Sequence, residues 1–271
     1  MDDWTLSERF DSPDGAVRWG RQGSGPPVVL LHGTPFSSVV WRDIAAALSA
    51  RHEVYVWDML GYGQSAMHEG HDVSLGAQQR IFSALLEHWG LDSPAVVAHD
   101  FGGTVALRTA LLSGNRYARL ALFDAVALGD WGTGFFRLAR DNRRVFTSVP
   151  EHLHEAMVRG YIATASHHGL PGTLADELVR PWLGSEGQAA FYRQIAQNDE
   201  RFTREIESRY AELDMPVLIG WGAQDTWLPP EFGARLAERI PNAEFRLFGS
   251  AGHLVQLDAP AQVTAALGTF L

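Results

Sequence analysis

The sequence predicts an α/β fold in which a mostly parallel sheet is flanked by helices and interrupted by a helical insertion. Three observations support this prediction. Short apolar runs alternate with helix-like segments over 1–128, the strand pattern stops over 129–213, and the alternation resumes over 214–271. Such alternation is typical of parallel sheets with right-handed crossovers. We therefore expect one α/β core in two parts, 1–128 and 214–271, separated by the helical insertion 129–213.

The first part of the core contains five short runs that are typical of strands. The expected strands are 16–21, 28–32, 53–57, 95–98 and 120–123. The run 28–32 is apolar throughout, which indicates burial on both faces. The expected helices are 41–48, 75–89 and 102–112. Residues 75–89 carry an apolar stripe at helical spacing and are followed by Gly90, a residue that often ends helices.

The insertion and the last part of the core differ in pattern. Residues 129–213 are predicted to form helices broken at Gly160, Gly169, Pro171 and Gly184. In the last part, 216–221 and 244–248 are expected to be strands, and 230–240 and 260–271 helices. No internal repeat or low-complexity segment interrupts this organisation.

Composition excludes several classes of function. The 271 residues carry 22 basic and 32 acidic side chains, a net charge of −10 that disfavours binding to nucleic acid or anionic lipid. Cysteine is absent, which excludes disulfides, thiol nucleophiles and cysteine-bound zinc. All basic residues are arginine, so a Schiff-base lysine and a phosphate-binding Walker lysine are also excluded.

We expect a cytoplasmic protein that acts on a small molecule, as a monomer or a homodimer. The N-terminus has no signal-peptide pattern, and no apolar run reaches the length of a membrane span. The paired histidines 68/71, 152/154 and 167/168 lack the H-E-x-x-H arrangement and are predicted to be solvated, so no metal is expected. The glycines of 61–66 resemble a dinucleotide fingerprint, but the next residues are predicted to be loop, so no cofactor is expected.

The segment 96–104, VVAHDFGGT, places Asp100 between a strand and a helix. Small residues surround Asp100, as a sharp turn with an outward-facing side chain requires. The start of the following helix favours a negative group. A nucleophile and a simple helix cap are both consistent with this position.

Two further polar residues follow later strands of the sheet. Asp225 comes after the strand 216–221, and His253 after the strand 244–248. Residues beyond the carboxyl ends of neighbouring parallel strands converge on one crevice. Singly, each fits a turn or a surface loop. The order of nucleophile, acid and histidine at three strand ends favours a catalytic triad.

These motifs resemble those of the α/β-hydrolase fold, in the branch with aspartate nucleophiles that includes epoxide hydrolases and dehalogenases. The matching stretches are 31–35 (LHGTP), 58–65 (DMLGYGQS), 99–103 (HDFGG), 222–225 (GAQD) and 252–253 (GH). The resemblance implies Asp100 as nucleophile, His253 as base and Asp225 as the acid that orients it. The insertion lies where this family carries a helical cap.

The resemblance also implies an oxyanion hole built from the backbone N–H groups of Thr34 and Phe101. His32 and Pro35, in the same H-G-x-P loop, are expected at the substrate pocket. The alternative for His32 and its glycine is a simple turn at the end of a strand. Trp131, Trp182 and Trp227 are expected to line or roof the pocket, although a tryptophan is often a core residue.

An aspartate nucleophile implies attack on a saturated carbon and a covalent alkyl ester. Epoxide hydrolysis is the favoured activity, with Tyr161 and Tyr192 of the cap as candidate acids for the opening ring. Tyr192 is the preferred candidate, since its Phe-Tyr-Arg context (191–193) resembles the tyrosine segment of epoxide hydrolases. Simple packing is the alternative for each tyrosine. Ala98 and Phe101 replace the glycine and tryptophan usual in this branch. Release of halide from a small organohalide, hydrolysis of an ester or lactone, and ligand binding without turnover are therefore kept as alternatives.

Overall fold

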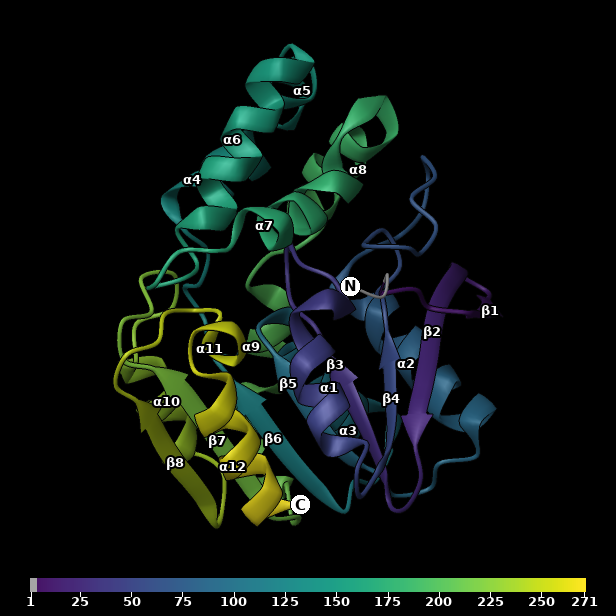
Figure 1. Ribbon diagram of the computed structural model, residues 1–271, viewed down its shortest axis with the longest axis vertical. Coiled ribbons are helices and arrows are strands. Elements are labelled where there is room, and N and C mark those ends of the chain that lie inside the picture. The colour runs from purple at the N-terminus through teal and green to yellow at the C-terminus, as the bar shows by residue number, and fades with distance from the viewer. Residues whose placement is uncertain (1–3) are drawn as a thin grey trace.

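The computed structural model describes residues 4–271. A single eight-stranded sheet forms the centre of this part of the chain (Figure 1). Its strand order is β1-β2-β4-β3-β5-β6-β7-β8. The strands are β1 (Glu8–Ser12), β2 (Gly15–Gly23), β3 (Pro27–Leu31), β4 (Glu53–Trp57), β5 (Ala95–His99), β6 (Arg119–Phe123), β7 (Val217–Gly222) and β8 (Ala243–Phe248). From β4 to β8 all neighbours are parallel, while β1 and β2 add an antiparallel edge. The α/β-hydrolase fold with a mostly parallel sheet is confirmed.

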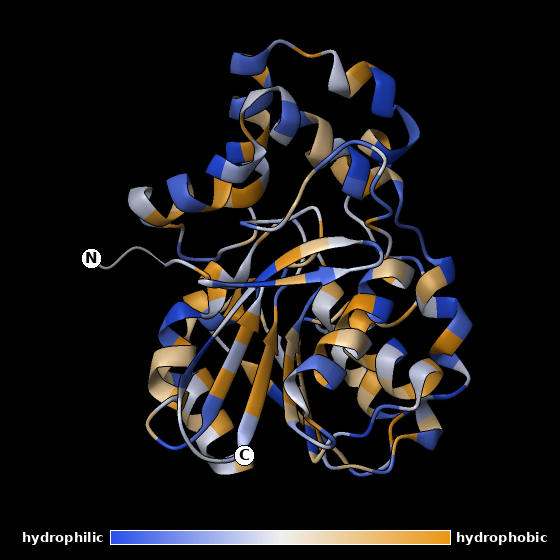
Figure 2. Cartoon of the chain, turned by 90° about the vertical axis from the view of Figure 1, so that its right-hand side faces the viewer, coloured by the Kyte–Doolittle hydropathy of each residue, from blue (hydrophilic) through white to orange (hydrophobic). Residues whose placement is uncertain are grey.

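The middle strands are the most apolar part of the sheet. β5 and β7 are buried along their whole length, and helices lie on both faces of the sheet (Figure 2). These helices are α1 (Arg42–Leu48), α2 (Leu75–Trp89), α3 (Phe101–Ser113), α10 (Glu231–Ala237), α11 (Val255–Asp258) and α12 (Pro260–Phe270). Parallel strands covered on both faces explain the continuous apolar runs in the sequence.

Helix α2 shows how local sequence sets an element's ends. The Ser74 side chain accepts a hydrogen bond from the N–H of Ala77 at 3.3 Å, which caps the first turn. At the other end Gly90 takes the left-handed conformation, with φ of 68°. The observed bounds agree with the prediction. By contrast, β1 and α11 were not predicted, because β1 is a mostly exposed, polar edge strand without an apolar run and α11 is a single turn of four residues.

Most of the segment between β6 and β7 forms a separate helical layer beyond one end of the sheet, while its last helix, α9 (Arg201–Glu207), packs against α3 in the core (Figure 1). Its helices are α4 (Gly134–Asp141), α5 (Arg143–Thr147), α6 (Glu151–Ala163), α7 (Gly172–Val179), α8 (Gly184–Ala196) and α9 (Arg201–Glu207). We call the layer of α4 to α8 the cap. Among the contacts that join it to the core, the indole N–H of Trp182 donates to the Pro35 carbonyl at 2.8 Å, and Arg42 pairs with Glu177. Within the described residues, no helix has the length and apolar composition needed to cross a membrane.

Candidate active site

Asp100 lies at the sharp turn between β5 and α3, with a φ of 51° and a ψ of −119°. This conformation is rare for a residue with a side chain, and such strain is concentrated at functional sites. The turn is possible because glycines surround it. A Cβ on Gly102 would lie 2.6 Å from the His32 carbonyl oxygen, and one on Gly33 would lie 2.3 Å from Asp100 Cβ. The small residues of the motif therefore allow this close packing.

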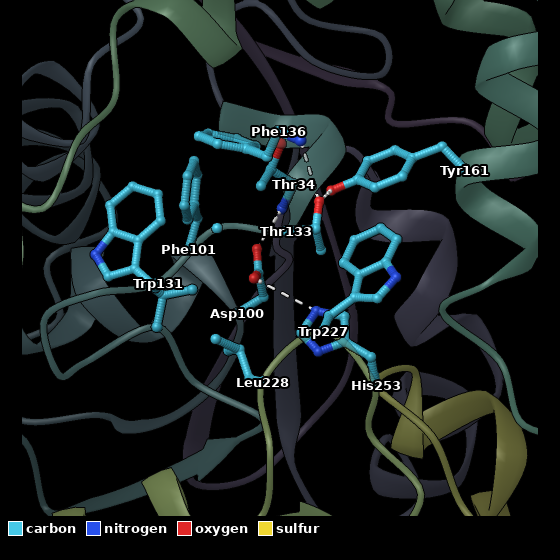
Figure 3. Close-up of a pocket in the computed structure, with 12 residues that line it drawn as sticks. Thr34, Asp100, Phe101, Trp131, Thr133, Phe136, Tyr161, Trp227, Leu228 and His253 are labelled. Carbon is cyan, nitrogen blue, oxygen red and sulfur yellow. Dashed lines mark hydrogen bonds and ion pairs between the residues drawn. The ribbon is translucent and has the colours of Figure 1, made fainter. Parts of the chain in front are cut away.

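The two carboxylate oxygens of Asp100 have different surroundings (Figure 3). Oδ1 accepts a hydrogen bond from the backbone N–H of Thr34 at 2.6 Å. Oδ2 lies 3.4 Å from Nε2 of His253, which is longer than a normal hydrogen bond. One oxygen is thus held by an oxyanion-type donor, and the other faces the histidine. Phe101, the first residue of α3, lines the same cavity.

His253 is fixed by Asp225. Its Nδ1 lies 2.9 Å from Asp225 Oδ2, and both side chains are fully buried. Asp225 Oδ1 accepts hydrogen bonds from the backbone N–H groups of Trp227 and Leu228, at 2.7 and 3.0 Å. The structure therefore brings together Asp100, His253 and Asp225, which are far apart in the sequence.

Burial disfavours the charged form of His253, but the charges and hydrogen bonds of Asp225 and Asp100 outweigh it. Together they raise the pKa of His253 well above its ordinary value. These surroundings favour the imidazolium form of His253. Any reaction that neutralises Asp100 removes part of this stabilisation and favours the neutral imidazole, the form that can accept a proton.

A small cavity lies over Asp100, between the core and the cap (Figure 3). Its walls are mainly aromatic and aliphatic. The lining residues are Thr34, Asp100, Phe101, Val126, Trp131, Gly132, Thr133, Phe136, Tyr161, Trp227, Leu228 and His253. Mostly apolar walls with a few polar groups are typical of small-molecule sites.

Tyr161 of α6 brings a hydroxyl to this cavity. Thr133 Oγ1 accepts the N–H of Phe136 at 3.1 Å and donates its own proton to the Tyr161 oxygen at 3.3 Å. With Thr133 as the donor, the Tyr161 proton is available to a molecule in the cavity. Burial raises the pKa of Tyr161, which keeps the hydroxyl protonated at neutral pH.

Two tryptophans line the cavity, but their indole N–H groups bond outside its lining. Trp131 donates to Thr203 Oγ1 at 3.1 Å, and Trp227 donates to Thr164 Oγ1 at 2.9 Å. Trp227 also stacks between Tyr161 and His253, with ring centroids 4.3 and 4.9 Å apart. Both tryptophans thus present ring surface to the cavity.

Tyr192 and Trp182 were expected at the pocket, and neither lines it. Tyr192 is fully buried, and its hydroxyl lies 2.9 Å from Nδ1 of His154. Nε2 of His154 donates to the Trp182 carbonyl at 2.8 Å, so Nδ1 is the acceptor for the Tyr192 proton. This corrects the expectation that Tyr192 faces the substrate, because its proton is already used within the cap. Trp182 instead joins the cap to the loop of Pro35.

His32 and Pro35 also lie outside the cavity lining. His32 Nδ1 donates to the Gly33 carbonyl at 2.9 Å, and Nε2 accepts the N–H of Met59 at 2.9 Å. The imidazole thus holds the loop that carries Thr34. The Thr34–Pro35 peptide bond is cis. The prediction that His32 and Pro35 contact substrate is corrected: they shape the oxyanion loop.

A family model described as alpha/beta hydrolase fold matches residues 26–260. The chain belongs to the α/β-hydrolase family. A crystal structure of an α/β-hydrolase fold protein from Burkholderia ambifaria is 46% identical, with a TM-score of 0.94 and coverage of 97% of each chain. Haloalkane dehalogenase 2 of Mycobacterium tuberculosis is 26% identical over 96% of this chain and 93% of its own. A cis-3-alkyl-4-alkyloxetan-2-one decarboxylase of Shewanella oneidensis is 26% identical over 92% of this chain and 83% of its own.

This hydrolase is therefore related to haloalkane dehalogenases over nearly its whole length. Its site contains one buried carboxyl group that the sequence analysis did not select. Asp124 directly follows β6, and one oxygen of Asp124, one of Asp225 and one ring nitrogen of His253 lie within 4.8 Å of one another. The signal that could have found it is the one that selected the triad, a polar residue just past a buried parallel strand.

Other lining residues of the hydrolase were also missed. Val126, Gly132, Thr133, Phe136 and Leu228 come from loops and from the start of α4. No motif marks them, since their position depends on how the cap packs on the core. A second, more open groove shares Thr133, Tyr161 and Trp227 with the cavity. This groove is lined mainly by apolar side chains and lies beside the cavity on the cap side.

Proposed function

We propose that this hydrolase opens a small epoxide through a covalent ester on Asp100. The observation that carries the proposal is the pairing of two groups in one apolar cavity. Asp100 offers a carboxylate oxygen, and Tyr161 offers a hydroxyl that accepts a hydrogen bond from Thr133 and so keeps its own proton for a ligand. An epoxide needs both, a nucleophile at carbon and an acid at oxygen.

In the first step, Asp100 Oδ2 attacks a ring carbon of the epoxide. The new bond joins Oδ2 to that carbon, and the ring C–O bond breaks. Thr34 holds Oδ1 and fixes the plane of the carboxylate. Tyr161 donates its proton to the departing ring oxygen, which becomes a hydroxyl. An alkyl ester of Asp100 remains.

In the second step, the ester is hydrolysed with His253 as the base. Ester formation removes the charge of Asp100, which lowers the pKa of His253. The imidazolium then gives its Nε2 proton to the Tyr161 phenolate across the cavity that both side chains line, which restores the tyrosine and leaves Nε2 able to take a proton from water. Water attacks the ester carbonyl carbon. The Thr34 and Phe101 N–H groups stabilise the oxyanion, and its collapse releases the diol and restores the carboxylate. Asp225 stabilises the imidazolium that forms.

Halide release is the second candidate, because a haloalkane dehalogenase is similar to the chain over nearly its whole length. The same attack by Asp100 would expel a halide. The indole N–H groups of Trp131 and Trp227 are engaged by threonines, however, which leaves them unable to hold a leaving halide. Turnover of a matched panel of small epoxides, haloalkanes and activated esters by the purified protein tests the proposal. Epoxide turnover is expected, and turnover of haloalkanes alone would contradict it.

Replacement of Tyr161 by phenylalanine should slow epoxide opening by about 10²-fold or more, the range for loss of an acid catalyst. The substitution removes the proton donor and keeps the ring that stacks on Trp227. Single-turnover kinetics with an epoxide would measure this step.

The matched control is Tyr192→Phe, since Tyr192 lies on the same cap but outside the cavity lining. It should lower stability by about 1 kcal/mol through the lost hydrogen bond to His154 and leave ring opening nearly as fast as before. Equal losses in the two variants would show that Tyr161 acts only by packing.

A further inference from the structure

Asp124 is a buried carboxyl group with an unusual backbone conformation. Its φ is 43°, in the left-handed region, and its side chain is 0% exposed. It directly follows β6, so it lies between the strands that lead to Asp100 and Asp225. Strain and burial together at a strand end indicate a position set by the site rather than by a turn.

The two neighbouring carboxyl groups differ in their hydrogen-bond donors. Asp225 accepts three hydrogen bonds, from the backbone N–H groups of Trp227 and Leu228 and from Nδ1 of His253. Asp124 accepts one, from the Gly222 N–H to Oδ1 at 2.8 Å, and its Oδ2 has no donor among the described residues. Donors stabilise the charged form of a carboxyl group, so Asp225 is the better site for the negative charge.

Two buried carboxylates this close cannot both be charged at low cost, because like charges repel and neither is solvated. The titratable groups that face Asp124 are Asp225 and His253. We propose that Asp124 holds a proton on Oδ2 and donates it in a hydrogen bond to Asp225, so that the Asp225 carboxylate stays fixed against His253. Asp124 is then a positioning residue that acts through Asp225.

The electrostatics agree with this arrangement. Burial, followed by the charge of Asp225, raises the pKa of Asp124 well above its ordinary value. A neutral carboxylic acid also satisfies Oδ2, which would otherwise be a buried oxygen with no partner. The pair Asp124–Asp225 then carries a single negative charge, which is the charge needed to balance the imidazolium of His253.

Asparagine has nearly the same shape as a protonated aspartic acid, with one acceptor and one donor group, so it can replace a neutral Asp124. The amide oxygen of Asn can accept the Gly222 N–H, and its NH₂ can donate to Asp225. Asparagine also tolerates the left-handed conformation. Asp124→Asn should therefore keep ester hydrolysis within about 3-fold of the native rate, since the hydrogen bonds are preserved. Asp124→Gly tolerates the same φ but removes the donor, and should slow hydrolysis by about 10-fold or more.

The matched control is the same change at the neighbouring residue. Asp225→Asn should slow ester hydrolysis by about 10²-fold or more, because it removes the negative charge opposite the imidazolium. In Asp124→Gly the covalent ester should also accumulate, since His253 acts only in the second step. This kinetic consequence rests on the proposed function. If Asp124→Asn slows ester hydrolysis as much as Asp124→Gly does, Asp124 is not neutral in the native protein and the proposal fails. If ester hydrolysis stays rapid in Asp124→Gly, Asp124 has no positioning role.

Infrared difference spectra test the proton without any substrate. The native protein at neutral pH should show the C=O stretch of a protonated carboxylic acid that is missing in Asp124→Asn. Identical spectra in this region would overturn the proposal whatever the outcome for epoxide hydrolysis. If the band is present but no covalent ester forms on Asp100, the proposed function fails and the protonated Asp124 stands.

Discussion

Asp100→Ala should abolish turnover, with a loss of about 10⁴-fold or more, as expected when a covalent nucleophile is removed. No other carboxylate among the lining residues of the cavity can take its place, because the rest of the described lining consists of His253 and uncharged residues. The loss should be found for every substrate that the native protein accepts. Steady-state kinetics with the best substrate of the panel would measure it.

Thermal unfolding of Asp100→Ala provides the control. Its folded state should persist, because the polar contacts of the carboxylate among the described residues are the Thr34 N–H at 2.6 Å and His253 Nε2 at 3.4 Å, and alanine keeps the Cβ that the turn already accommodates. A folded variant that keeps turnover within about 10-fold of the native protein would exclude Asp100 as the nucleophile, since this is far below the loss expected for removal of a covalent nucleophile.

His253→Gln should slow turnover by about 10²- to 10⁴-fold, the range for loss of a general base. The step that stops is ester hydrolysis. Attack by Asp100 needs no base, since the carboxylate is already ionised. Covalent adduct should therefore build up on the protein during incubation with substrate, and intact-mass spectrometry would detect it.

The size of the mass increase also separates the two candidate reactions. An epoxide adds its whole mass to Asp100, because ring opening expels no fragment. An organohalide adds its mass less that of the hydrogen halide. Double substitution at Asp100 and His253 should show no adduct at all. An unchanged mass in His253→Gln, with a substrate that the native protein turns over, would count against the two-step scheme.

Sequence reasoning succeeded where short-range rules decide position. A buried parallel strand followed by a polar residue places that residue at the carboxyl end of the sheet, and this placed Asp100, Asp225 and His253 near one another. Thr34 followed from the H-G-x-P loop. Such positions depend on the sheet, whose strand order follows from the chain's alternation of elements. The same rule applies to Asp124, which was overlooked because Asp225 already supplied the expected acid.

Residues of the cap could not be assigned in the same way. Tyr161 and Tyr192 both lie on cap helices with mixed burial, and the Phe-Tyr-Arg context of 191–193 favours Tyr192, which does not line the cavity. Only packing decides that Tyr161 meets the cavity while Tyr192 bonds to His154. Trp182 likewise follows no motif, and its indole contacts the Pro35 carbonyl, 147 residues earlier in the chain.

The origin of the product oxygen tests the covalent role of Asp100 most directly. A single turnover in ¹⁸O-water should place the heavy isotope in the peptide that contains Asp100 and leave the newly formed product hydroxyl unlabelled, because water attacks the ester carbonyl. If Asp100 instead acted as a general base for direct attack by water, the product would carry the label. A labelled product with an unlabelled Asp100 peptide would contradict the covalent mechanism.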